Sequence, residues 1–143
     1  MKLSSLEFEH EEYIPKKFTC DGEDVSPALM IEDIPEETKR LALIVDDPDA
    51  PMGTWVHWVV FNISKKDVIE EGEVPGTQGI NDFGKLQYGG PCPPSGTHRY
   101  FFKLYALDEK LDLKEGCHKK DLLKAMEGHI IEETELIGLY QHK

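Results

Sequence analysis

Basic residues are scarce in this chain of 143 residues, in which 16 Lys and Arg stand against 28 Asp and Glu and give a net charge of −12. Nucleic acids and anionic membrane surfaces are bound through cationic faces, so this charge predicts no nucleic-acid partner. The chain also lacks an apolar run near the roughly 20 residues that cross a bilayer, which predicts no integral membrane association. Its length suits one globular domain, residues 1–143, with its own hydrophobic core.

Cysteine is rarer still, with three residues, and their positions follow no familiar framework. Cys20, Cys92 and Cys117 are odd in number and widely spaced, unlike the cysteines of disulfide-rich domains or zinc sites. The N-terminus turns acidic at Glu7 before the apolar segment of a secretory signal could form, so we expect a reducing, cytoplasmic location. In that environment we expect three free thiols, with no bound metal and no cofactor.

Glycine and proline cluster in three segments, and the runs between these segments are rich in β-branched and aromatic residues. This alternation predicts a mainly β fold with long loops. Strong strands are expected at residues 41–47, 55–63 and 98–107, and weaker ones near 3–8, 28–32 and 130–140. One short helix is expected at residues 119–127, because Leu122 and Met126 share a stripe and Gly128 follows as a terminator.

Two of the strong strands carry an ionisable side chain among apolar neighbours. Asp47 falls on the inward face of its strand, at the end of residues 41–47. The two-residue period of a strand places His57 on the same face as Val59 and Phe61. An Asp-Pro-Asp turn and a core histidine satisfied by its neighbours are the structural alternatives for these two residues.

The third strong strand follows a loop rich in glycine and proline and opens with His98 and Tyr100 on its core side. If the ends of the three strands converge, Asp47, His57, His98 and Tyr100 line a small cavity with apolar walls. Two histidines beside a carboxylate supply hydrogen-bond donors whose charge can be tuned near neutral pH. Such a cavity would suit a phosphate or carboxylate group.

Several motifs occur together in the order typical of one protein family. They are Ser26-Pro27-Ala28-Leu29, Asp47-Pro48-Asp49-Ala50-Pro51, Trp55-Val56-His57-Trp58, Asn81-Asp82-Phe83-Gly84, Tyr88-Gly89-Gly90-Pro91-Cys92-Pro93-Pro94 and Gly96-Thr97-His98-Arg99-Tyr100. With them the chain resembles the phosphatidylethanolamine-binding protein family, and within it the prokaryotic branch of Raf-kinase-inhibitor-like proteins.

This resemblance implies a large central antiparallel sheet packed on a smaller sheet, with one or two short peripheral helices. It also implies an anion-binding pocket at one edge and a cis peptide bond, for which Ala50–Pro51 is the candidate. Relatives similar to this chain are often dimers, so a homodimer is a further expectation. The pocket positions implied by the resemblance are Asp47, His57, His98 and Tyr100, with a rim of Pro51, Cys92, Pro93 and Pro94.

Three classes of function follow from these residues. The leading hypothesis is a non-catalytic binding protein for phosphate-like or carboxylate-like groups, such as the phosphoethanolamine head group or a phosphorylated ligand. The alternative is a protein-interaction module that inhibits a kinase or a serine protease, with a basic partner favoured by the acidic surface. An enzyme is the third class, either through a metal triad that includes Asp47 or through Ser26 or Ser95 in a hydrolytic set. Neither set has a recognisable spacing, so we expect no enzymatic activity.

Overall fold

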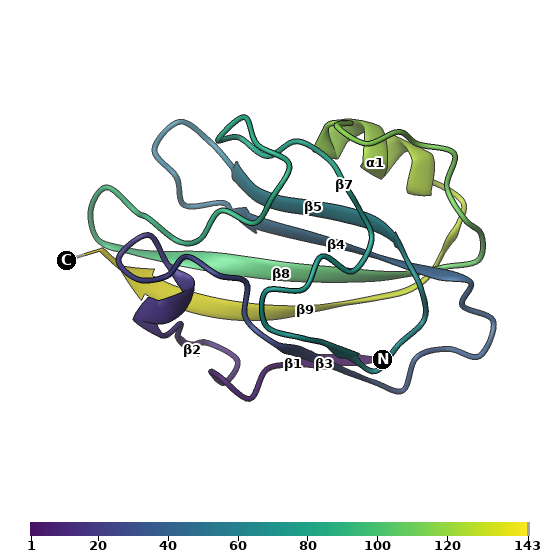
Figure 1. Cartoon of the computed structure of the whole chain (residues 1–143), viewed down its shortest axis with the longest axis horizontal. Helices are drawn as coiled ribbons and strands as arrows, with labels where there is room; N and C mark the ends of the chain where they lie inside the picture. The colour runs from purple at the N-terminus through teal and green to yellow at the C-terminus, as the bar shows by residue number, and fades with distance from the viewer. Residues whose placement is uncertain (143) are drawn as a thin grey trace.

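The computed structural model describes residues 1–142, which form two β-sheets, one α-helix and one turn of 3-10 helix (Figure 1). This arrangement confirms the mainly β fold expected from the sequence. The elements are β1 (Lys2–Ser4), β2 (Glu12–Tyr13), the 3-10 helix (Lys16–Phe18), β3 (Leu29–Glu32), β4 (Arg40–Asp47), β5 (Trp55–Ile63), β6 (Val68–Ile69), β7 (Thr77–Gln78), β8 (Thr97–Leu107), α1 (Lys119–Met126) and β9 (Ile130–Gln141).

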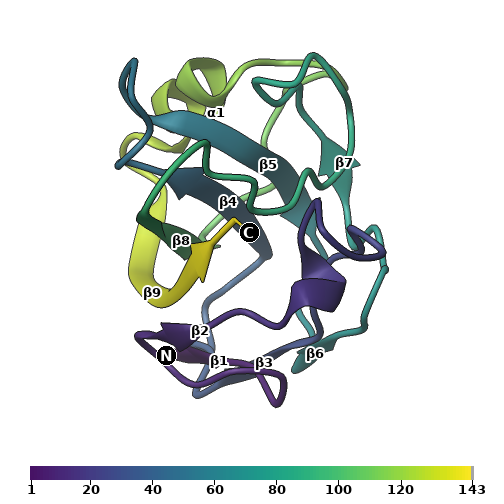
Figure 2. The ribbon, with the colours of Figure 1, turned by 90° about the vertical axis from the view of Figure 1, so that its left-hand side faces the viewer.

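The large sheet has six strands in the order β2-β9-β8-β4-β5-β7 and is antiparallel except where β2 pairs with β9. Strand β4 lies at its centre, and every residue from Leu41 to Asp47 is buried. This burial explains the continuous apolar run, because both faces of the strand are covered. The small sheet, β1-β3-β6, packs against one face of the large sheet, and α1 lies on the opposite face (Figure 2).

Two hydrophobic cores result, one on each face of the large sheet. The core between the sheets includes Val45, Trp58 and Phe102, and the core beneath α1 includes Ile44 and Met126. Neighbouring residues of β4 therefore belong to different cores, as the alternation of a strand requires.

The side-chain alternation of β5 is interrupted at His57, which corrects the face expected for this residue. Asp46 pairs with Val56 whereas Val45 pairs with Trp58, so His57 is the extra residue of a β-bulge. The bulge turns His57 away from the core beneath α1, toward Tyr100 of β8, with 5.2 Å between the ring centroids. A strict period of two cannot foresee this shift, because the bulge arises from pairing with another strand.

Helix α1 confirms the predicted helix, although it ends one residue earlier. The Asp121 carboxylate accepts a hydrogen bond from the His118 backbone N–H (2.9 Å) at the start of the helix. Lys119 donates to the fully buried carboxylate of Asp46 (2.7 Å), which also accepts from Lys103 (3.2 Å). The Lys119 bond joins α1 to β4, whereas the Lys103 bond joins β8 to β4 within the sheet.

Two of the three cysteines form a disulfide, so the expectation of three free thiols was wrong. Cys20 and Cys92 are bonded although 72 residues separate them, whereas Cys117 is free. Folding brings the two segments together because the Tyr88 hydroxyl donates to Phe18 O (2.7 Å) and the backbone N–H of Cys20 donates to Pro91 O (3.1 Å). The positions of the cysteines in the sequence do not indicate that these two segments lie side by side.

The expected cis bond at Ala50–Pro51 was also wrong, since every peptide bond between the described residues is trans. The loop reverses direction by other means. Asp49 N–H donates to Asp47 Oδ1 (2.8 Å), and Gly53 adopts a φ of 107°, a conformation that favours glycine.

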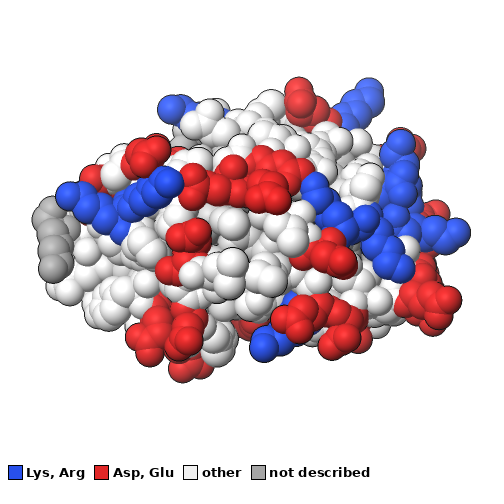
Figure 3. All heavy atoms as spheres, turned by 60° about the horizontal axis from the view of Figure 1, so that its bottom comes forward, with Lys and Arg blue, Asp and Glu red and all other residues white. Residues whose placement is uncertain are grey.

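Charge is distributed unevenly on the surface. On the face shown in Figure 3, acidic side chains form several separate groups, and basic side chains gather mainly toward one end. Within residues 1–142, no helix has both the length and the apolar character needed to cross a membrane.

Candidate functional site

A cavity of about 270 Å³ lies where β4 ends and where β5 and β8 begin, near the C-terminus in Figure 1. The four residues expected to converge all line it, and so do the four expected at the rim. The structure adds Ala50, Met52, Trp55 and Phe83 to Asp47, Pro51, His57, Cys92, Pro93, Pro94, His98 and Tyr100.

Asp47 and His98 form a buried pair in the wall of this cavity. His98 Nδ1 lies 2.7 Å from Asp47 Oδ2, and because a carboxylate only accepts, the imidazole is the donor. Asp47 Oδ1 accepts the backbone N–H of Asp49 at 2.8 Å. The carboxylate is thus engaged at both oxygens, and it holds His98 so that Nε2 is the nitrogen available to a ligand.

His57 is fixed by a two-way contact with the loop that precedes β8. Its Nδ1 donates to Gly89 O (2.6 Å), and its own carbonyl accepts Gly89 N–H (3.0 Å). Burial is the largest influence on this imidazole and lowers its pKa from the ordinary value of 6.5. His57 is therefore neutral at pH 7, with Nε2 as a hydrogen-bond acceptor.

Tyr100 lines the cavity, and its buried hydroxyl has no well-formed hydrogen-bond partner among the described residues, although the Asp47 carboxylate and the backbone of Cys92 lie near it. Burial, followed by the nearby charge of Asp47, raises the pKa of this phenol well above its ordinary value. The hydroxyl therefore remains protonated and able to donate. A buried donor without a partner is uncommon in folded proteins, and it is often explained by a ligand that completes the bond.

Asn81 holds the backbone of His57 and Phe83 in place through hydrogen bonds, a role that the sequence did not reveal. The Asn81 side-chain amide donates to His57 O (3.2 Å) and Gln87 O (2.7 Å), and its oxygen accepts from the backbone of Phe83 (3.0 Å). These bonds hold the Phe83 ring against His57, with centroids 5.3 Å apart. The asparagine belongs to one of the motifs, but only the fold shows what it holds.

The rim combines a rigid part and an exposed apolar part. Arg99 donates to the Asp49 carboxylate through Nε (2.9 Å) and Nη2 (2.8 Å), and these bonds join the acidic loop to β8. Met52 is 97% exposed, while Trp55 and Phe83 are 38% and 42% exposed. These three side chains were not predicted to line the cavity. The one sequence feature that could have indicated them is that they are apolar and lie close to the predicted site residues in the sequence.

The residues proposed for catalysis do not assemble here. Ser26 lies by a different hollow, beside Trp58 and Tyr88, and Ser95 is exposed in the loop before β8. Within residues 1–142, the groups whose ligand atoms lie close enough to share a metal ion do not include Asp47, His57 or His98.

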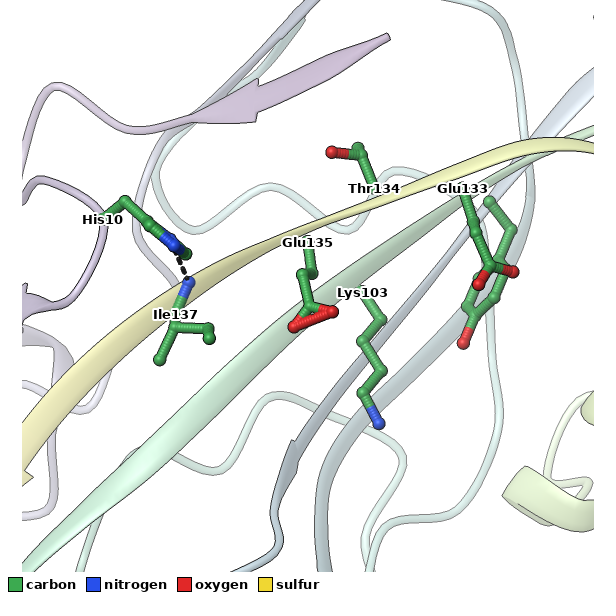
Figure 4. A pocket seen from close by; sticks show the side chains of 7 residues that line it. His10, Lys103, Glu133, Thr134, Glu135 and Ile137 are labelled. Atoms are coloured by element: carbon green, nitrogen blue, oxygen red, sulfur yellow. Dashed lines mark hydrogen bonds between the residues drawn. The ribbon is translucent and has the colours of Figure 1, made fainter.

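A larger hollow of about 520 Å³ lies on the face of β8 and β9 that points away from the small sheet (Figure 4). Its polar side chains are arranged as cross-strand neighbours, with Lys103 opposite Glu135. His10 reaches it from the N-terminal segment and accepts the Ile137 backbone N–H (3.1 Å). These groups have the arrangement of a solvated sheet surface, so the candidate site is the cavity at the strand ends.

Comparison with known proteins agrees with this architecture. The sequence profile of the phosphatidylethanolamine-binding protein family matches residues 4–141. A UPF0098 protein of Methanothermobacter thermautotrophicus is 52% identical over 149 residues, with 99% of each chain covered. A UPF0098 protein of Pyrococcus horikoshii is 49% identical, with 100% of this chain and 77% of the relative covered.

Solved structures give the same assignment. A crystal structure described as a phosphatidylethanolamine-binding protein homologue of Chlamydia trachomatis has a TM-score of 0.95 and 44% identity, and the match covers 99% of this chain and 97% of that one. The structure of E. coli YbcL, described as a new member of the mammalian family, has a TM-score of 0.91, 30% identity and coverage of 99% and 98%. The chain therefore belongs to the phosphatidylethanolamine-binding protein family.

Proposed function

We propose that this protein is a non-catalytic binding protein whose cavity holds the phosphate-like or carboxylate-like group of a small anionic ligand. The convergence of Asp47, His57, His98 and Tyr100 around one cavity carries this proposal. The family name suggests the phosphoethanolamine head group as one such ligand. A phosphorylated small molecule presents the same chemistry.

Two side chains supply the donors that an anion needs. The Tyr100 hydroxyl is protonated and has no well-formed hydrogen-bond partner among the described residues, so it is a candidate donor to a ligand oxygen. His98 becomes a second donor when Nε2 carries a proton, and Asp47 at Nδ1 balances the positive charge. The apolar walls exclude water and strengthen both hydrogen bonds.

His57 makes binding depend on a proton. At neutral pH its Nε2 is an acceptor, so it favours a ligand oxygen that still carries a hydrogen, such as that of a phosphate monoanion. As pH falls, protonation of either the ligand or the imidazole removes the repulsion between Nε2 and an anionic oxygen, and burial places the pKa of His57 below its ordinary value of 6.5. Binding should therefore tighten toward acidic pH.

Calorimetric titration with inorganic phosphate and with phosphoethanolamine at about pH 5.5 and about pH 8 tests the proposal. We expect tighter binding at the lower pH and loss of binding in His98→Ala. His129→Ala is the matched control, because His129 precedes β9 at the end of the sheet opposite the cavity. Absence of binding at both pH values, or equal binding by His98→Ala and the wild type, would contradict the proposal.

The exposed apolar rim favours a second candidate, a module that inhibits a kinase or a serine protease. Met52, Trp55 and Phe83 form an exposed apolar surface at the cavity mouth, and aromatic side chains often dominate protein interfaces. A phosphorylated or acidic side chain of the partner would then occupy the cavity. Inhibition assays on purified kinases and serine proteases test this candidate. Trp55→Ala should abolish inhibition while retaining phosphate binding, and inhibition unaffected by this variant would contradict it.

A further inference from the structure

Three side chains with metal-binding atoms meet beside the cavity. The sulfur atoms of Cys20 and Cys92 and one ring nitrogen of His142 all lie within 4.8 Å of one another. They come from the segment after the 3-10 helix, from the cavity rim and from the end of β9. In the structure described here the two sulfur atoms are joined as a disulfide.

A carboxylate orients the histidine of this cluster. His142 Nδ1 lies 3.0 Å from Asp21 Oδ2, and the same oxygen accepts the Tyr140 hydroxyl at 2.6 Å. Metal-binding histidines commonly have a carboxylate as hydrogen-bond partner in this way. The cluster thus has an outer partner as well as candidate ligands.

Hydrogen bonds, in addition to the disulfide, hold the two segments that carry Cys20 and Cys92 close together. Three hydrogen bonds join the segments that carry them: Cys20 N–H to Pro91 O (3.1 Å), Tyr88 hydroxyl to Phe18 O (2.7 Å) and Gly90 N–H to Asp24 Oδ1 (2.7 Å). The Cα atoms are 5.5 Å apart. Two thiolates on one zinc ion lie about 3.8 Å from each other, given Zn–S bonds of about 2.3 Å and tetrahedral angles. Rotation of the cysteine side chains is enough to reach this separation.

We propose that, after reduction of the Cys20–Cys92 disulfide, Cys20, Cys92 and His142 bind a zinc-type divalent cation beside the cavity. Reduction by a dithiol transfers two electrons and two protons to the disulfide and leaves two thiols, while the dithiol closes to its own disulfide. Binding of the cation releases both thiol protons. Three protein ligands leave the fourth tetrahedral position to water or to an incoming group. The disulfide and the metal site exclude each other, so thiol redox state selects between them.

Cobalt(II) provides a direct probe, because thiolate ligands on this ion give an intense charge-transfer absorption. The intact protein is reduced anaerobically with a phosphine, which takes up the oxygen atom of a water molecule and becomes a phosphine oxide, and is then titrated with Co²⁺. We expect one Co²⁺ per chain with the thiolate band, displacement of Co²⁺ by Zn²⁺, and no such band for the oxidised protein. Zn²⁺ should also raise the melting temperature of the reduced protein and not that of the oxidised protein.

Variants identify the ligands. Cys117→Ser, which removes the free thiol outside the cluster, should bind as the wild type does, whereas Cys20→Ser should lose the band. His142→Ala preserves the disulfide and should weaken Co²⁺ binding at least about tenfold, and Asp21→Asn should weaken it about 10- to 100-fold. A reduced wild type without the thiolate band, or undiminished affinity in His142→Ala, would overturn the proposal. Phosphate titration of the oxidised protein remains a separate test of the cavity.

Discussion

Substitution of Tyr100 by phenylalanine removes one oxygen atom and isolates the effect of the unpartnered hydroxyl. A buried polar group without a hydrogen bond costs about 1–3 kcal/mol of stability. Tyr100→Phe should therefore raise the free energy of unfolding by about 1 kcal/mol or more. For a chain of this size, that gain corresponds to an increase of about 2–5 °C in melting temperature. The ring itself is retained, so its packing against His57 stays intact.

The same substitution should weaken anion binding, because a hydrogen bond to a charged group contributes about 1.5 kcal/mol or more and 1.4 kcal/mol corresponds to a tenfold change in affinity. Thermal unfolding and phosphate calorimetry on the same preparations measure both quantities. Tyr105→Phe is the matched control, since Tyr105 lies on the other face of β8, in the core beneath α1. A lower melting temperature for Tyr100→Phe together with unchanged phosphate affinity would refute the reasoning.

Three further predictions concern stability. Arg99 lowers the pKa of Asp49 from 3.8 to about 2, so the ion pair stabilises the protein above about pH 4, and this contribution is lost as pH falls toward 2. Asp49→Asn should remove this acid dependence in urea unfolding. Because both side chains are partly exposed, the effect should be below about 1 kcal/mol. Burial lowers the pKa of His57 below that of the unfolded chain, so the unfolded chain takes up a proton more readily and the free energy of unfolding should fall as pH drops below 6.5. A His57→Gln variant whose stability has the same pH profile as the wild type would contradict this prediction. Gly90→Ala should lower the free energy of unfolding by about 1–3 kcal/mol, because the added Cβ would clash with the backbone oxygen of Phe18. A urea unfolding midpoint equal to that of the wild type would contradict this prediction.

Much of the fold was predictable because strand and turn signals are local. The nearly continuous apolar run in residues 41–47, which ends in two aspartates, identified the central strand, and the expected range 55–63 matches β5 at both ends. The three strands of two residues, Glu12–Tyr13, Val68–Ile69 and Thr77–Gln78, were missed, since such short segments carry no period of their own and form by pairing with longer strands.

The residues around the cavity could be predicted but their orientation could not, and their role in ligand binding remains a prediction. Asp47, His98 and Tyr100 were placed correctly by their positions at strand ends. The orientation of His57 depends on a register shift, and the disulfide at Cys92 depends on the approach of segments 72 residues apart. Both are tertiary effects that a single sequence does not encode locally.

The bulge in β5 divides the strand into two parts that can vary independently. Residues before Trp58 shape the cavity through His57 and Trp55, whereas Val59 and Phe61 pack beneath α1. A mutant library confined to positions 55 and 57 could therefore change ligand preference while preserving the interior beneath the helix. Because His57 is itself the extra residue of the bulge, a deletion here would remove the imidazole or turn the neighbouring side chains to the opposite face, so this strand should accept exchanges of amino acid far better than changes of length.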